Sequence, residues 1–297
     1  AFSDCRELFI DPVTGEWPNR YEMKMSDFKA GDLALNSFKL LEFFSSKMSA
    51  KEEVEMMEIL WMVASYFESC ATHSLYMSKP GLPSFLNLGG TPLNDAIIAM
   101  MEIVPKFKAE TGVQKVNTIF LTDGASNRMN GVYDYWLDKN TGEHNKHVNT
   151  LRGSIMISDP KTLKNYEIAG YDITDGLLRV LKDRVPDMNL VGFFIAGSGR
   201  SGRVDKRVLY SLQRNLDMNA IMEQVKFINK NKFLAIESKG YDEMYVLPAK
   251  GMTVENDGLS DDLVGASKAK LKSAFGKSMK GKVESRQLLN KFVKLVA

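Results

Sequence analysis

The stretch that decides the fold is a short apolar run closed by an acidic residue and a glycine: Asn117-Thr118-Ile119-Phe120-Leu121-Thr122-Asp123-Gly124. Its residues from Thr118 to Thr122 are β-branched or apolar, and no charged side chain within the stretch precedes Asp123, which is typical of a strand covered by helices on both faces. In an open α/β sheet, ligands bind in the crevice beyond the carboxyl ends of the strands. Asp123 therefore stands where a binding site is expected.

A second stretch, Gly89-Gly90-Thr91-Pro92-Leu93, predicts a glycine turn that opens an amphipathic helix, which Gly112 ends. Pro92 suits the first helical position, so Thr91 is predicted to be the N-cap. A threonine hydroxyl can cap a helix through one lone pair and face a metal ion through the other. A hydroxyl and a carboxylate are hard oxygen ligands, suited to Mg²⁺, Mn²⁺ or Ca²⁺.

Helical and strand patterns alternate through most of the chain. Helices are predicted over residues 31–72, 93–111, 173–187, 204–215 and 220–229, and strands over 116–122, 188–196, 232–237 and 244–247. This alternation predicts an α/β fold with a doubly wound, mostly parallel sheet flanked by helices. The methionine-rich helix within residues 31–72 has two interpretations, a core-facing amphipathic helix or a partner-binding helix. The first is favoured because most amphipathic helices of globular proteins turn their apolar face to the core.

Residues 128–172 form a longer connection than usual and predict a β-rich insertion. Tyr133–Trp136 indicates a strand, and Ser154–Ser158 and Asn165–Ile168 indicate a hairpin around the turn residues at 159–162. A long insertion with its own secondary structure is more often functional than filler. We expect one α/β domain over residues 1–255 and a separate basic tail over 256–297.

The tail differs in charge from the rest of the chain. From Ala266 to Ala297 it holds eight lysines and one arginine against the single acid Glu284. Six of these lysines are candidates for contact with nucleic acid or an acidic partner: Lys268, Lys270, Lys272, Lys277, Lys280 and Lys282. The alternative, which we favour, is a solvated linker followed by a docking helix at Ser285–Val296.

Two other patterns are weak. His144 and His147 have H-x-x-H spacing but no thiolate or third histidine to complete a zinc site. Gly197, Gly199 and Gly202 match a phosphate-binding spacing, but the G-K-[ST] of a P-loop is absent, so a strand-to-helix connection is the better interpretation.

The composition is that of an ordinary globular protein. Of the 297 residues, 44% are hydrophobic and 26% are charged, with a formal net charge of +2. The two cysteines, Cys5 and Cys70, predict no disulfide framework and fit a reducing compartment. No apolar run approaches the roughly 20 residues that span a bilayer. We expect a cytoplasmic protein, or one packaged inside a particle made in the cytosol.

The GGTPL and LTDG motifs, in this order, resemble the von Willebrand factor A (VWA) domain and its metal-ion-dependent adhesion site. These motifs are most similar to those of CobT-like VWA proteins, a family related to cobaltochelatase subunits and found in bacteria and large bacteriophages. In that family a third motif, S-R-x-L-L-x-x-F, follows the first two, and Ser285–Phe292 matches it here. The resemblance implies that Thr91 and Asp123 are metal ligands. Ser126 and Asn127 are close enough in sequence to add oxygens or to orient a ligated water.

One motif of that family is missing from the sequence. Its D-x-S-x-S loop, which supplies most of the metal ligands, occurs nowhere in the 297 residues. In the family this loop precedes a strand that ends in a motif similar to Ala1-Phe2-Ser3-Asp4. Because the chain starts at that motif, we expect the sequence to begin partway through the domain. The missing loop would then lie roughly 30–50 residues upstream.

The resemblance implies a non-catalytic adaptor that binds a carboxylate of its partner protein through a shared metal ion. Relatives of the family act together with AAA+ ATPases of the MoxR or CobS type, so the resemblance implies a partner of that class. The alternative is a phage structural or virion-packaged protein, in contact with other virion proteins, that uses a VWA scaffold with a degenerate metal site. No pair of nucleophile and base, zinc set or phosphate loop in the sequence points to an enzyme.

Overall fold

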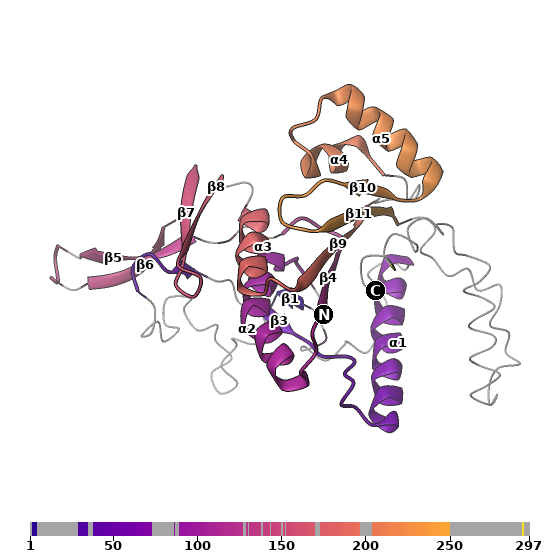
Figure 1. The fold of residues 1–297 in the computed structure, drawn as a ribbon, viewed down its shortest axis with the longest axis horizontal. Helices are drawn as coiled ribbons and strands as arrows, with labels where there is room; N and C mark the ends of the chain where they lie inside the picture. The colour runs from indigo at the N-terminus through magenta and orange to yellow at the C-terminus, as the bar shows by residue number, and fades with distance from the viewer. Residues whose placement is uncertain are drawn as a thin grey trace, which may run out of the picture. The chain divides into compact units, whose positions relative to one another are not determined.

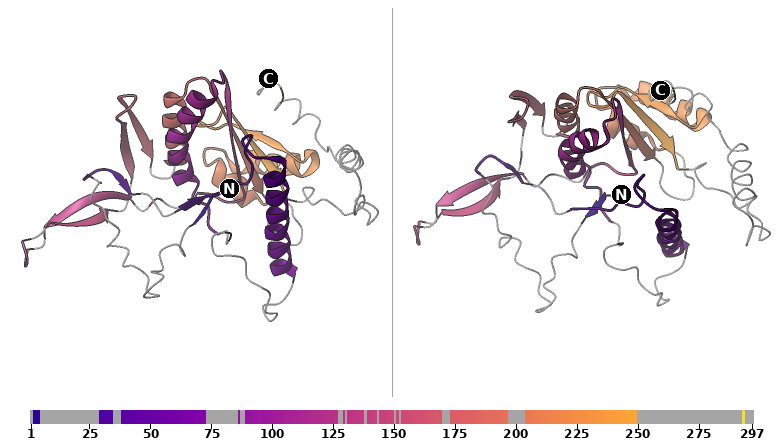
Figure 2. Two further views of the ribbon diagram at one scale, coloured as in Figure 1. Left: turned by 90° about the horizontal axis from the view of Figure 1, so that it is seen from below. Right: turned by 60° about the horizontal axis from the view of Figure 1, so that its bottom comes forward.

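The computed structural model describes residues 2–4, 29–34, 38–72, 86, 89–126, 129, 131–137, 139–142, 144–149, 151, 153–169, 173–196, 204–249 and 293. The chain divides into two compact units, and the helices α2 (Leu93–Thr111) and α3 (Ile173–Arg184) contribute residues to both. The first unit comprises residues 1–103 and 125–177, and the second comprises residues 104–124 and 178–297. Figures 1 and 2 show the elements of each unit.

The second unit is built on a four-stranded sheet in the order β10-β11-β9-β4. Its strands are β4 (Val116–Thr122), β9 (Met188–Ala196), β10 (Leu234–Ile236) and β11 (Glu243–Pro248). β9 is parallel to both β4 and β11, while β10 is antiparallel to β11. The prediction of an α/β fold with a mostly parallel sheet is confirmed for this part of the chain.

Strand β4 differs from the sequence prediction in its burial. Val116 and Phe120 are buried, but Ile119 and Leu121 on the other face are 45% and 54% exposed. β4 pairs with β9 on one side only among the described residues, so it is an edge strand there. The prediction of a strand covered on both faces was therefore wrong, because the apolar composition of a strand does not reveal its place in a sheet.

Two helices cover one face of this sheet, α4 (Lys206–Leu212) and α5 (Met218–Asn231) (Figure 1). Each begins at an aspartate whose carboxylate accepts first-turn amides, Asp205 for α4 and Asp217 for α5. A core of apolar side chains joins the helices to the sheet: Ala196, Val204, Leu209, Ile221, Ile228, Leu234, Ile236 and Val246. The helical patterns at 204–215 and 220–229 thus predicted both helices, and the observed helix ends differ from the predicted ends by a few residues.

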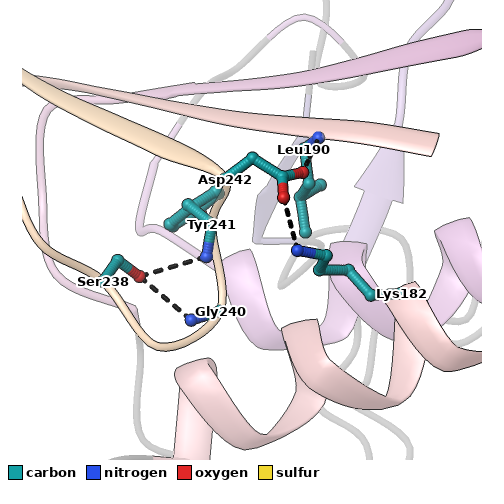
Figure 3. Close-up of polar contacts among 6 residues, drawn as sticks. All are labelled: Lys182, Leu190, Ser238, Gly240, Tyr241 and Asp242. Carbon is teal, nitrogen blue, oxygen red and sulfur yellow. Dashed lines mark hydrogen bonds and ion pairs between the residues drawn. The ribbon is translucent and has the colours of Figure 1, made fainter. Parts of the chain in front are cut away.

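The β10–β11 turn is fastened to the start of β9 through Asp242 (Figure 3). One oxygen of its carboxylate accepts the Leu190 amide at 2.8 Å, and the other pairs with the Lys182 ammonium of α3. Within the turn, the Ser238 hydroxyl accepts the amides of Gly240 and Tyr241 at 3.2 and 3.1 Å. These bonds lie at the amino-terminal ends of the parallel strands, where they stabilise the fold. Asp123 follows the carboxyl end of β4, at the opposite end of the strands.

Among the residues that the structure describes, the first unit contains three small antiparallel sheets. β1 (Phe2–Asp4) pairs with β3 (Phe38–Leu40), and the order β2-β5-β6 joins Leu33–Ala34, Gly131–Leu137 and His144–Asn149. The third sheet is the hairpin of β7 (Ser154–Asp159) and β8 (Lys164–Ala169). The prediction of strands within residues 128–172 is confirmed.

Helix α1 (Ala50–Thr72) is shorter than the helix predicted over residues 31–72. Residues 33–34 and 38–40 are strands, so the helical spacing of their apolar residues was misleading: short apolar runs satisfy both periods. α1 begins with a capping box, in which the Ser49 amide donates to the Glu52 carboxylate at 2.7 Å and lowers the pKa of Glu52.

The predicted core face of α1 is only partly buried. Val54 and Met57 are 50% and 53% exposed, Ile59 and Leu60 are half-buried, and Val63 is buried. The interpretation of α1 as a core-facing helix is therefore wrong at Val54 and Met57 and holds at Val63. None of the described helices is long and apolar enough to cross a membrane.

The β7–β8 hairpin packs on the unit-one parts of α2 and α3. Lys161 in its turn forms an ion pair with Glu102 of α2. Ile168 of β8 lies so close to α3 that a Cβ atom built on Gly176 would be 2.0 Å from the Ile168 Cδ1. The turn itself is held by the buried Asp159 carboxylate, which accepts the Thr162 hydroxyl at 2.8 Å. The hairpin is thus a fixed part of the unit.

Candidate functional site

The first turn of α2 is the start of the candidate site. Gly90 has a φ of +63°, a left-handed conformation that favours glycine, and it turns the chain into the helix. The Ala96 amide donates to the Pro92 carbonyl at 3.0 Å, and the Leu93 amide donates to the Thr91 carbonyl at 2.8 Å. Pro92 rather than Thr91 therefore holds the N-cap position, one residue later than predicted, because Thr91 and Leu93 form a separate tight turn.

Three polar side chains from separate segments meet at this helix start. The Asn94 amide donates to the Ser126 hydroxyl oxygen at 3.0 Å, which satisfies one of the amides that a helix start leaves unpaired. The Asn94 side-chain oxygen accepts the hydroxyl of Thr174, the second residue of α3, at 2.7 Å. Asn94 is only 1% exposed, whereas its partners Ser126 and Thr174 are half-buried, so both bonds are partly buried.

A buried carboxylate lies in the same helical turn. Asp95 is fully buried in the first turn of α2, where the partial positive charge of the helix start stabilises an acidic side chain. Thr91 is half-buried just before the helix. We name these five residues the α2-start cluster: Thr91, Asn94, Asp95, Ser126 and Thr174. All five belong to the first unit.

Asp123 follows β4 in the second unit, and its side chain is exposed. The turn after the strand is closed by Thr122, whose hydroxyl donates to the Gly124 carbonyl at 2.7 Å. This places the carboxylate at the carboxyl end of β4, as the sequence predicts. The convergence of Thr91 and Asp123 on one ion stays a prediction, because the two residues belong to different units.

The remaining candidate residues have no described side chains. Asn127, the six tail lysines and the glycine-rich segment at 197–202 lie outside the described residues, and His144 and His147 lie in β6 with undescribed side chains. The described part of the chain contains no cluster of three or more His, Cys, Asp or Glu that could hold a metal. The α2-start cluster is not of that type, because hydroxyl and amide groups form most of it.

Sequence reasoning missed Asn94 and the role of Thr174. The available signal was the pair Asn94-Asp95, two consecutive polar residues among apolar ones in the first turn of a helix predicted to be packed. The partner of Asn94 lies 80 positions away in the sequence, so no local pattern could identify Thr174.

Comparisons with protein-family models, curated proteins and solved structures find no match for this chain. The resemblance to VWA domains therefore rests on the sequence motifs alone.

Proposed function

We propose that this protein is a VWA-type interaction module that binds a divalent cation through Thr91 and Asp123 and offers an open coordination position to a partner carboxylate. The observation that carries the proposal is the α2-start cluster, in which Asn94 holds Ser126 and Thr174 at the helix preceded by Thr91. The resemblance of GGTPL and LTDG to the VWA metal site supports the same residues.

The chemistry of the donor set fits Mg²⁺ or Mn²⁺. Thr91 and Ser126 carry hydroxyl oxygens, and Asp123 carries an exposed carboxylate; none of the three is a nitrogen or sulfur ligand. Asp123 lies three residues before Ser126, and an extended chain of that length spans at most about 11 Å. The chain therefore limits the separation of the Cα atoms of Asp123 and Ser126 to about that distance. When bound, the ion would supply a coordination position for an acidic side chain of a partner.

Metal binding is tested by titrating the protein with Mn²⁺ in a calorimeter. We expect Asp123→Ala and Thr91→Ala to lower the Mn²⁺ affinity at least tenfold, about 1.4 kcal/mol, without changing the circular dichroism spectrum. Glu237→Ala is the matched control, because Glu237 is also an exposed acid that directly follows a strand. Since β10 runs antiparallel to β11, Glu237 lies at the opposite end of the sheet from Asp123. Equal Mn²⁺ affinity in Asp123→Ala and Glu237→Ala would exclude the site.

Partner binding is tested with a purified MoxR-type AAA+ ATPase, the partner class that the resemblance implies. We expect co-elution in Mg²⁺, loss of co-elution in EDTA, and loss in Asp123→Ala with the fold intact. Co-elution that is unchanged by EDTA and by Asp123→Ala would remove the adaptor role.

The second candidate is a structural or virion-packaged protein that uses the scaffold without a working metal site. One observation favours it: the hydroxyls of Ser126 and Thr174 each already have a hydrogen-bond partner within the protein. No heat of Mn²⁺ binding, together with recovery of the protein in purified particles, would establish this candidate in place of the first.

A further inference from the structure

Strand β4 leaves one long edge of the second unit's sheet without a neighbour among the described residues. It pairs with β9 alone, in an unbroken parallel register over its seven residues. A strand at the edge of a sheet presents a row of backbone amides and carbonyls that can pair with another strand. Proteins protect such edges with short strands, lysine, proline or a bulge, and β4 has none of these within its bounds.

The opposite edge of the same sheet is protected. Its strand, β10, has only three residues, which is too short a segment to hold a long pairing with another chain. The open edge is therefore a property of β4 rather than of the sheet as a whole.

The side chains of β4 alternate between a more buried face and an exposed face. Val116 and Phe120 are buried, whereas Ile119 and Leu121 are 45% and 54% exposed. On the neighbouring strand β9, the residue paired with Ile119 is Val191, which is fully buried. The apolar face of the sheet thus continues onto β4 and is exposed there, where a further strand would cover part of it.

The charges that flank β4 indicate which strand fits this edge. The strand itself has no charged residue, but Lys115 precedes it and Asp123 follows it, and both residues are exposed. Neither of them forms an ion pair with another described residue. In the sequence Ile119 lies midway between the two, so β4 carries a positive end and a negative end about a central apolar residue.

This symmetry makes β4 complementary to itself in the antiparallel direction. If β4 of a second copy pairs with β4 so that the two Ile119 residues are opposite each other, Lys115 of each copy lies opposite Asp123 of the other. Residues that are directly opposite in an antiparallel pair have their Cβ atoms about 4.5–5.5 Å apart, so both ion pairs can form. A parallel pairing in register would instead place like charges side by side.

We propose that this protein forms a two-fold symmetric dimer by antiparallel pairing of β4 with β4 of a second copy, centred on Ile119. The pairing joins the sheets of the two second units into one continuous sheet. It satisfies the backbone groups of the open edge, brings the two Ile119 side chains together and closes two Lys115–Asp123 ion pairs. This inference goes beyond the proposed function and does not depend on a bound metal ion.

The first test reverses one charge and then restores complementarity. The Kd of the dimer is measured by sedimentation equilibrium of the full-length chain in EDTA, which removes divalent ions that could compete for Asp123. We expect Lys115→Glu to weaken the dimer about tenfold or more, because it places two acids opposite each other at both ends of the pairing. The double variant Lys115→Glu/Asp123→Lys should recover the wild-type Kd.

Lys226→Glu is the matched control for this test. It changes the net charge by the same amount at an exposed lysine of α5, the helix that packs on β10 and β11 rather than on β4. The Kd of the dimer should remain at the wild-type value in this variant.

The second test examines the register by disulfide formation between copies. In a background with both native cysteines, Cys5 and Cys70, replaced by serine, Ile119→Cys should form a disulfide-linked dimer on mild oxidation. The two Cα atoms at this position would be about 4.5–5.5 Å apart, which a disulfide can bridge. Asn117→Cys is the control, because its two copies would lie four residues apart along the strands, roughly 13 Å, and should not cross-link.

Every result of these tests supports or overturns the dimer. A dimer that is weakened by Lys115→Glu, restored by the double variant and cross-linked through Ile119→Cys supports it. A wild-type protein that is monomeric at all concentrations would overturn it and leave the β4 edge to another strand. A dimer that responds equally to Lys115→Glu and Lys226→Glu, or that does not cross-link through Ile119→Cys, has its interface elsewhere and would overturn it as well. The Mn²⁺ titrations are separate measurements, so failure of the dimer leaves the proposed function in place.

Discussion

Gly176 in α3 is where the β7–β8 hairpin approaches the helix most closely, and its replacement by alanine tests that packing. The added Cβ would lie 2.0 Å from Ile168 Cδ1 and 2.6 Å from Ile168 Cγ1, both far inside van der Waals contact. Ile168 is 2% exposed, so its side chain has little room to move aside.

Two effects of opposite sign decide the magnitude. Alanine is favoured over glycine inside a helix by about 1 kcal/mol. Overpacking a well-filled core costs about 1–3 kcal/mol. The difference of the two effects is a loss of up to about 2 kcal/mol, so we expect Gly176→Ala to lower the free energy of unfolding by about that much or less.

The assay is urea unfolding of the full-length protein in a double-mutant cycle with Ile168→Val, which removes the Cδ1 atom. The double variant should recover part of the stability lost in Gly176→Ala, so the two substitutions should be non-additive by at least about 0.5 kcal/mol. A Gly176→Ala variant that is more stable than wild type, with additive behaviour, would show that the hairpin does not pack on α3 as described.

Two further substitutions test strain and burial elsewhere. Leu163 in the hairpin turn has a φ of +58° and is 86% exposed. Asparagine tolerates this conformation better than leucine, so Leu163→Asn should raise the free energy of unfolding, measured by urea titration, by about 0.5–1 kcal/mol. A lower free energy of unfolding would mean that the Leu163 side chain makes stabilising contacts despite its exposure. Tyr245 is fully buried, and burial, then the nearby negative charge of Glu243, raises the pKa of Tyr245 to about 12. The unfolded chain loses this proton near pH 10 while the folded chain keeps it, so stability should fall as pH rises from 10 to 12, by up to about 2.7 kcal/mol. Tyr245→Phe should lack this component in urea titrations at pH 9, 10 and 11, and an unchanged alkaline loss would assign it to other groups.

Local sequence patterns were sufficient for most of the helices and strands. The capped helices at 204–229, the strands ending at Thr122 and Ala196, and the hairpin around Asp159 all follow from short-range chemistry: caps, turn residues and β-branched runs. The same patterns failed at residues 33–34 and 38–40, where a few apolar residues fit a helix and a strand equally well. The pairing of Leu33–Ala34 with Gly131–Val132, and of Phe38–Leu40 with Phe2–Asp4, decided for strands.

The sequence by itself determined which groups stand at the ends of elements: Thr91 before a helix and Asp123 after a strand. An ion bound through these two side chains would be one that prefers oxygen ligands. Only the tertiary structure decided that Asn94 meets Ser126 and Thr174, which lie 32 and 80 positions away, and that Ile119 and Leu121 face outward among the described residues. The reason is that hydrogen bonds between distant segments and the place of a strand in a sheet depend on how elements pack, whereas caps and turns depend on residues within one turn of each other.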